Sequence, residues 1–290
     1  MTVFSPKSAR SPAPSIVLGS ARRLLGPLFG IAWLVVALGP IYYLILGSLR
    51  NQADALSGSP WVPSHFTLAN YQQALLQGGM LTATRNSVVV TVATALGSVL
   101  FGFAASYSIV RSKRRVLRST LFRVFLFGLT VPLEGSVVSL FVLLNKIGLY
   151  NNLLGLILPQ LAFNLPLAVV VLMSYLRDVP LEIYEALDLD GASEWKKITR
   201  VALPLARPAL LGIVVFIALQ AWNSFLLPLV LLQSAGVSVV PLGILRFETT
   251  YTVDTPGLLA SVVISAVPLL VLYLVGRRHL LRGFTLAVGR

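Results

Sequence analysis

Long apolar stretches separated by short polar segments dominate the pattern along this chain. A helix needs about 20 apolar residues to cross the hydrocarbon core of a bilayer, at about 1.5 Å of rise per residue. Six stretches reach that length, at residues 24–46, 87–110, 119–144, 153–176, 209–232 and 257–276. The pattern therefore predicts an all-α, polytopic membrane protein with about six transmembrane helices in one domain, residues 21–290.

The composition agrees with a membrane setting. The chain is 56% hydrophobic, its mean hydropathy is +0.84, and only 11% of its residues are charged. An average soluble domain has roughly 25% charged residues. Prolines inside the stretches, such as Pro132, Pro159 and Pro166, are tolerated in membrane bundles because neighbouring helices satisfy the freed backbone groups. The expected surroundings are therefore membrane lipid.

The basic residues indicate how the helices are oriented. Of 23 Lys and Arg residues, all but Arg50, Arg85, Lys146 and Arg246 fall on the side of the membrane that holds both termini. The positive-inside rule then predicts cytoplasmic N- and C-termini, N-in/C-in. Residues 1–20, rich in Ser, Pro and Arg, are predicted to be a disordered cytoplasmic tail. The net charge of +13 is thus a topology signal and excludes a nucleic-acid partner.

Residues 178–206, here called the acidic loop, contrast with the rest of the chain. This loop between the fourth and fifth stretches holds six of the ten acids. Apolar residues at Ile183, Ala186 and Leu187 have the spacing of a helix with one apolar face. Start signals at Asp178 and Pro180, a stop at Gly191 and an N-cap at Ser193 predict two helices joined by a glycine turn.

The second helix is expected to place Trp195, Ile198 and Ala202 on one side and to end at Leu203 and Pro204. Two short amphipathic helices outside the membrane need a cover for their apolar sides. They can pack on their own bundle or lie along lipid headgroups. Six acids disfavour contact with anionic lipid and favour a basic partner protein.

The same loop carries a recognisable motif. Glu185, Ala186 and Leu187, then Gly191, then Val201 to Pro204 resemble the E-A-A, G, I-x-L-P pattern of permease subunits of binding-protein-dependent ABC importers, although Leu187 stands where that family prefers alanine. The segments HFTLANYQ, NSVVVTVAT, KIGLYNNLLGLILP, YLRDVP and WNSFLLPL resemble the carbohydrate importers of the maltose type. They are most similar to the shorter, six-span partner subunit of that type.

The resemblance implies a transport subunit in a bacterial or archaeal cell membrane. This subunit would form half of an alternating-access pathway for a sugar or oligosaccharide. The expected partners are a second permease subunit in a heterodimer, two cytoplasmic ATPase subunits and an extracytoplasmic solute-binding protein. The acidic loop would be the coupling helix that fits a cleft of the ATPase. Its expected coupling residues are Glu182, Glu185, Ala186, Leu187, Asp190, Gly191, Ala192, Leu203 and Pro204.

Motifs that are missing from the sequence also indicate that ATP is bound by a partner subunit and not by this chain. The chain has no Gly-Lys pair and hence no phosphate-binding P-loop, so ATP and Mg²⁺ are expected in the partner ATPase and no cofactor in this chain. The absence of cysteine excludes thiolate metal sites and a cysteine nucleophile. The two histidines, His65 and His279, are far apart in sequence. Neither a metal site nor an enzyme site is expected.

Polar residues inside the predicted spans are candidates for the solute pathway. Glu134 is a wall or gate of the path, a local cap where Pro132 breaks the helix, or a residue that lies nearer the outer interface than the predicted span places it. Neutral amides and an indole suit an uncharged polyol, but hydrogen bonds between helices are the commoner role of such groups. These neutral candidates are Gln160, Asn164, Gln220, Trp222, Asn223 and Ser224.

The main rival hypothesis is a secondary transporter driven by an ion gradient. That class uses intramembrane groups that bind ions or protons, together with paired broken helices. Glu134 is the only carboxylate within the predicted spans. An enzyme embedded in the membrane is a more distant alternative.

Overall fold

The computed structural model describes residues 17–59, 61–247 and 253–288, and every regular element within them is a helix. The long helices are α1 (Val17–Ser48), α4 (Met80–Arg111), α7 (Leu153–Arg177), α10 (Leu203–Trp222) and α13 (Thr255–Val288). The shorter elements are α2 (Gln52–Ser57), α3 (Ala69–Gln72), η1 (Gln73–Gln77), α5 (Arg115–Gly128), α6 (Leu133–Lys146), α8 (Leu181–Leu189), α9 (Glu194–Lys197), η2 (Ile198–Ala202), α11 (Leu226–Leu231), η3 (Ala235–Val237) and α12 (Val240–Leu245).

The number of membrane spans agrees with the sequence pattern. In the described part of the chain five helical segments are long and apolar enough to cross a membrane, and α5 with α6 forms a sixth if the bent pair is one span. The prediction of an all-α protein with about six spans is confirmed. Of the predicted tail, residues 1–16 lie outside the described residues, and α1 begins at Val17.

Two predicted spans differ in detail. The stretch at 119–144 is two helices, α5 and α6, which meet at 94°. Pro132 stands at the N-cap of α6, where its missing N–H and fixed φ favour a new helix start. The stretch at 209–232 ends at Trp222, and a separate short helix, α11, follows it.

The core lies where α4, α7 and α10 pack together. Apolar association gives helices in lipid little stabilisation, so close van der Waals contact and hydrogen bonds between helices must supply it. Gly102 of α4 faces Ala168 of α7 so closely that an added Cβ would lie 2.7 Å from the Ala168 Cβ. Nearby, the Ser106 hydroxyl donates to the Val169 carbonyl at 3.0 Å. Small residues thus let α4 and α7 approach closely.

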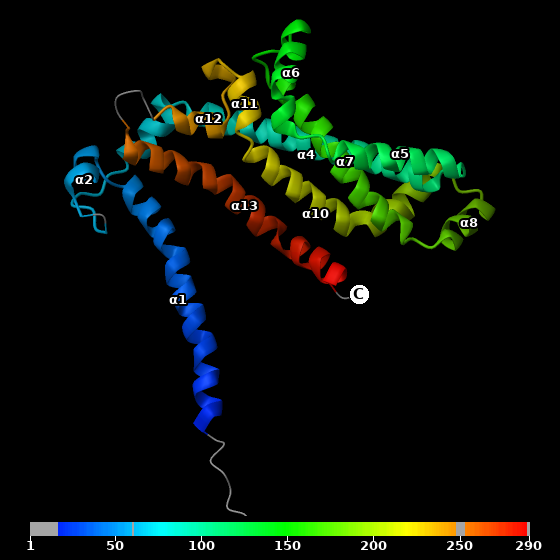
Figure 1. Cartoon of the computed structure of the whole chain (residues 1–290), viewed down its shortest axis with the longest axis horizontal. Coiled ribbons are helices and arrows are strands. Elements are labelled where there is room, and N and C mark those ends of the chain that lie inside the picture. The colour runs from blue at the N-terminus through cyan, green and yellow to red at the C-terminus, as the bar shows by residue number, and fades with distance from the viewer. Residues whose placement is uncertain (1–16, 60, 248–252, 289–290) are drawn as a thin grey trace, which may run out of the picture.

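Different helices extend from the two ends of the helical bundle (Figure 1). Helix α1 leaves the bundle, and in its most apolar window no residue is buried within this chain. Helix α8 projects beyond the ends of α4 and α7, at the end of the bundle away from α2. Helix α8 of the acidic loop therefore lies at the edge of the packed core, at the bundle end that also holds Arg111 and Arg177.

Candidate functional site

The acidic loop folds as the predicted helix, glycine turn and helix. Helix α8 follows Pro180 and ends at Leu189. Gly191 has a φ of 68°, a left-handed conformation that glycine adopts without steric cost. The Ser193 side chain accepts from the Lys196 N–H at 3.3 Å and caps α9. The roles predicted for Pro180, Gly191 and Ser193 are confirmed.

The orientation of α8 differs from the predicted apolar face. Ile183 and Ala186 are exposed, Leu187 is half-buried, and the residue that enters the core is Tyr184, with 3% of its surface exposed. The ring of Tyr184 lies 6.5 Å from that of Tyr107 on α4, centroid to centroid, and the Arg111 guanidinium carbon lies 4.2 Å from its centre. The contacts of Tyr184 therefore determine which face of α8 packs against the bundle. The spacing of the aliphatic residues of α8 does not predict this face.

Charged groups complete this attachment. The buried Lys197 ammonium contacts the carboxylates of both Asp188 and Glu194, the latter at 2.6 Å. Arg111 lies 3.7 Å from Asp188, and the Tyr107 hydroxyl donates to Glu194 at 2.8 Å. These contacts join the end of α4, the end of α8 and the start of α9. We call the set the anchor cluster; its members are Tyr107, Arg111, Tyr184, Asp188, Glu194 and Lys197.

Two groups on α8, Asp188 and Tyr184, have shifted pKa values in the anchor cluster. The hydrogen bond from Lys197 lowers the pKa of Asp188, and the charges of Lys197 and Arg111 act in the same direction. Burial raises the pKa of the Tyr184 hydroxyl, so this group stays protonated at neutral pH. At neutral pH Asp188 therefore holds the negative charge that binds Lys197 and Arg111.

The second helix of the loop does not end where the sequence predicted. Helix α9, the π-helical turn η2 and α10 run on as one span, Glu194–Trp222. Leu203 and Pro204 lie inside this span and do not terminate it. Because Pro204 has no N–H to donate, the preceding turn widens, and the Leu203 N–H donates to the Ile198 carbonyl. The second helix of the acidic loop is thus continuous with the fifth span.

The outer side of the loop exposes two large apolar side chains. Leu189 is 90% exposed, and Trp195, predicted to share one side with Ile198 and Ala202, is 72% exposed. The expected coupling residues that are exposed are Glu182, Glu185, Ala186, Asp190, Gly191, Leu203 and Pro204, whereas Leu187 and Ala192 are half-buried. The loop therefore presents carboxylates beside two large apolar side chains.

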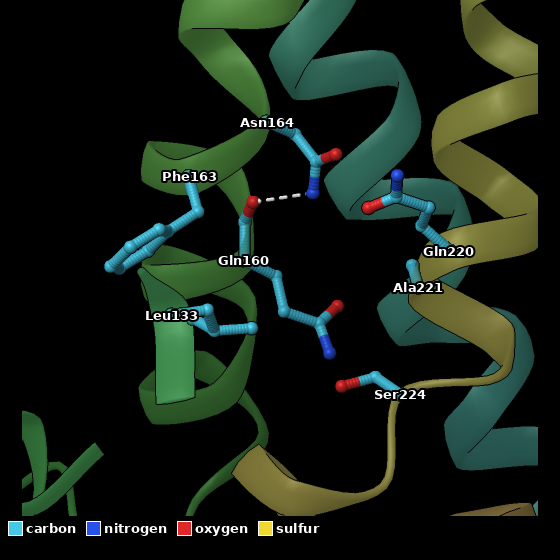
Figure 2. Close-up of a pocket in the computed structure, with 7 residues that line it drawn as sticks. All are labelled: Leu133, Gln160, Phe163, Asn164, Gln220, Ala221 and Ser224. Atoms are coloured by element: carbon cyan, nitrogen blue, oxygen red, sulfur yellow. Dashed lines mark hydrogen bonds between the residues drawn. The ribbon is translucent and has the colours of Figure 1, made fainter. Parts of the chain in front are cut away.

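A second polar site lies among the spans. A cavity of about 170 Å³ between α7 and α10, here called the polar cavity, is lined by Leu133, Gln160, Phe163, Asn164, Gln220, Ala221 and Ser224 (Figure 2). The Asn164 amide donates to the Gln160 carbonyl at 2.8 Å. The Gln160 Nε2 is buried without a hydrogen-bond partner, which costs about 1–3 kcal/mol. Four of the predicted neutral residues thus meet at one place.

The other candidate pathway residues lie elsewhere. Glu134 is exposed in the first turn of α6. Trp222 is buried in an apolar cluster with Met80 and Phe247. Asn223 is exposed and donates to the Leu219 carbonyl at 2.8 Å. The structure therefore does not place Glu134, Trp222 or Asn223 at the polar cavity.

Sequence reasoning missed several residues of both sites. Tyr107 and Arg111 belong to a different span from the acidic loop, and no role was predicted for Lys197. Phe163 and Leu133 form apolar walls of the polar cavity. The spacing of Glu194 and Lys197, three residues apart in a predicted helix, is a signal that could have indicated part of the anchor cluster, because opposite charges at that spacing are neighbours on a helix.

The fold, the projecting loop and the spans can now be compared with known proteins. Residues 97–283 match the family described as the binding-protein-dependent transport system inner membrane component. The chain belongs to this family. It is therefore a multi-pass membrane component of a transport system and not an enzyme, and the family assignment decides for this class over the ion-gradient-driven rival.

Relatives and solved structures agree with the family. This family member is 32% identical over 252 residues to the diacetylchitobiose uptake system permease protein NgcG of Streptomyces coelicolor, covering 86% of this chain and 83% of that protein. It is 29% identical over 268 residues to the trehalose/maltose permease protein MalG of Thermococcus litoralis, covering 91% and 95%. Its fold matches a chain of a bacterial alginate ABC importer with a TM-score of 0.77, at 21% identity over 92% of this chain and 99% of that one.

Proposed function

We propose that this chain is the permease subunit of an ATP-driven importer for a sugar or oligosaccharide. It forms half of an alternating-access pathway in a heterodimer with a second permease subunit. Two cytoplasmic ATPase subunits bind ATP and Mg²⁺, and an extracytoplasmic binding protein delivers the solute. Both termini and the acidic loop face the cytoplasm. The diacetylchitobiose and trehalose/maltose systems of its relatives support a carbohydrate as the solute.

The observation that carries the proposal is the two-sided character of α8. Its inner side is fixed to the bundle by Tyr184 and by the contact of Asp188 with Lys197. Its outer side exposes Leu189, next to Glu185 and Asp190. A helix that is firmly attached on one side and presents apolar and acidic groups on the other suits docking to a separate protein.

The attachment also accounts for coupling. Lys197 and Glu194 begin the helix that continues to Trp222, and Tyr107 lies four residues before the end of α4 at Arg111. A partner that moves α8 therefore moves the ends of two spans with it. ATP binding can shift the pathway between two states only if the ATPase contacts α8 differently in each state.

Charge reversal at Glu185 tests the proposal. The exposed Glu185 side chain makes no contribution to the anchor cluster, so Glu185→Lys should fold normally yet reduce ATPase co-purification and ATP-driven uptake of maltose, trehalose or diacetylchitobiose. Glu185→Gln should have a smaller effect. A Gln72→Lys control on α3 introduces a lysine at an exposed site outside the acidic loop and should behave as wild type. Wild-type uptake and ATPase recovery in Glu185→Lys would count against the docking role.

A further inference from the structure

The polar cavity contains a buried amide with one free end. The Gln160 side chain is 4% exposed, and the Thr94 hydroxyl lies 3.3 Å from its Oε1 while Nε2 has no partner. The Thr94 hydroxyl can accept as well as donate, so exchanging the amide oxygen and nitrogen would leave the oxygen free instead. In either arrangement one end is unbonded, and Figure 2 shows the amide directed into the cavity near Ser224.

The side chains that line the polar cavity are suited to hydrogen-bond with the hydroxyl groups of a solute. Asn164, Gln220 and Ser224 supply neutral donors and acceptors, and Phe163 supplies an apolar wall. None of the seven lining residues carries a charge. A charged solute would lose its hydration here without a counter-charge, whereas hydroxyls can exchange hydrogen bonds with the amides.

The backbone beside the cavity is irregular. Helix α10 ends at Trp222 and α11 begins at Leu226, so the chain that carries Ser224 is not helical. On α7, Gln160 and Asn164 lie about 10 and 16 Å along the helix from Leu153, at 1.5 Å per residue. At membrane depth, non-helical backbone is tolerated where it is buried in protein or lines a water-filled cavity.

We propose that the polar cavity is a solute-contact site in this subunit, for a neutral, hydroxyl-bearing sugar ring. Gln160 donates from Nε2 to a solute hydroxyl, with Ser224 and Gln220 on the opposite side. The volume of about 170 Å³ is below the roughly 300–1,000 Å³ of pockets that enclose drug-sized ligands, so one ring fits at a time. The inference rests on the proposed function and adds that this subunit touches the solute.

Gln160→Leu tests the site in the complete importer, reconstituted in vesicles with its partner subunits and binding protein. Radiolabelled maltose, trehalose and diacetylchitobiose are the neutral probes, and a diuronate is the acidic probe. Gln160→Leu should lower the initial uptake of the neutral probe that wild type carries by about tenfold, the effect of one lost hydrogen bond. ATP hydrolysis stimulated by the binding protein should remain, and Asn223→Ala should transport as wild type.

The outcomes separate the two proposals. Wild-type uptake in Gln160→Leu, or wild-type preference for the diuronate, would overturn the neutral solute site while leaving the proposed function intact. Failure of the wild-type importer to hydrolyse ATP or to carry any of the four probes would overturn the proposed function itself.

A labelling experiment tests the site without relying on the folding of Gln160→Leu. The chain has no cysteine, so Ser224→Cys introduces its only thiol. A charged thiol reagent that does not enter lipid should modify Ser224→Cys, and the transported neutral probe should slow the reaction. Leu100→Cys, on an exposed apolar position of α4, should resist the reagent. A reaction at Ser224→Cys that is absent, or is unchanged by the probe, would overturn the proposal.

Discussion

The Tyr107 hydroxyl donates a hydrogen bond to the Glu194 carboxylate at 2.8 Å, across 87 residues of sequence. This contact ties the end of α4 to the first turn of the fifth span. Because Glu194 also binds Lys197, which in turn binds Asp188, the contact connects both spans to α8.

Tyr107→Phe removes this hydrogen bond and keeps the aromatic packing against Tyr184. Glu194 is exposed enough for water to replace part of the bond, so the expected loss is about 1 kcal/mol in the free energy of unfolding. We expect a larger effect on coupling: ATP hydrolysis should continue while uptake per ATP falls. Tyr175→Phe, in the same core cluster, is the control. Unchanged uptake per ATP in Tyr107→Phe would exclude this contact from coupling.

Asp188 should make the stability of the acidic loop depend on pH. Its pKa is lowered in the folded protein, so its carboxylate stabilises the fold above the unfolded value of about 3.9. That stabilisation is lost as the pH falls through the lower, folded pKa. In thermal unfolding, the difference between wild type and Asp188→Asn should be largest near neutral pH and shrink below about pH 4. A difference that is constant over this range would contradict the ion pair.

Gly191→Ala tests the turn after α8, with Gly148→Ala as a matched control. Both glycines have a left-handed φ, of 68° and 73°, and open space around the Cβ position. Each substitution should cost about 1–2 kcal/mol of backbone strain. Only Gly191→Ala should also reduce ATP-driven uptake, because Gly148 lies between α6 and α7. Equal uptake by the two variants at matched protein levels would show that the α8 turn has no special role.

Gly102→Ala tests the close packing of α4 on α7. The new methyl would lie 2.7 Å from the Ala168 Cβ and 3.5 Å from the Ala168 carbonyl carbon, so the helices must separate. Overpacking of this kind costs about 1–3 kcal/mol. Gly212→Ala on α10 meets no atom within 4 Å and should be neutral or slightly stabilising. Equal unfolding temperatures for the two variants would contradict the packing.

The sequence predicted where the helices and turns lie better than it predicted which face of each helix is buried. Pro180, Gly191 and Ser193 act locally, so the helix, turn and helix of the acidic loop could be read from their order. The burial of Tyr184 could not be predicted in this way, since its partners Tyr107 and Arg111 come from another span. Pro132 was visible as a helix break, but the 94° bend depends on how α5 and α6 pack.

The residues that line the polar cavity were likewise only partly predictable from the sequence. Gln220, Trp222 and Asn223 are near neighbours in sequence, yet successive helical residues point about 100° apart. Gln220 therefore lines the polar cavity while Trp222 enters an apolar cluster and Asn223 bonds its own helix. Which polar residue faces the cavity depends on helix rotation, which a list of polar positions does not contain.

The most direct measurement of the central claim is the reactivity of a cysteine at Leu189, which is 90% exposed on α8. In a chain without native cysteine, Leu189→Cys should react rapidly with a maleimide when the ATPase subunit is omitted. Co-expression of the ATPase should slow this reaction about tenfold or more, because the side chain becomes buried in the interface. Leu56→Cys on α2, also exposed, should react equally in both cases. Equal reactivity of Leu189→Cys with and without the ATPase would contradict docking at α8.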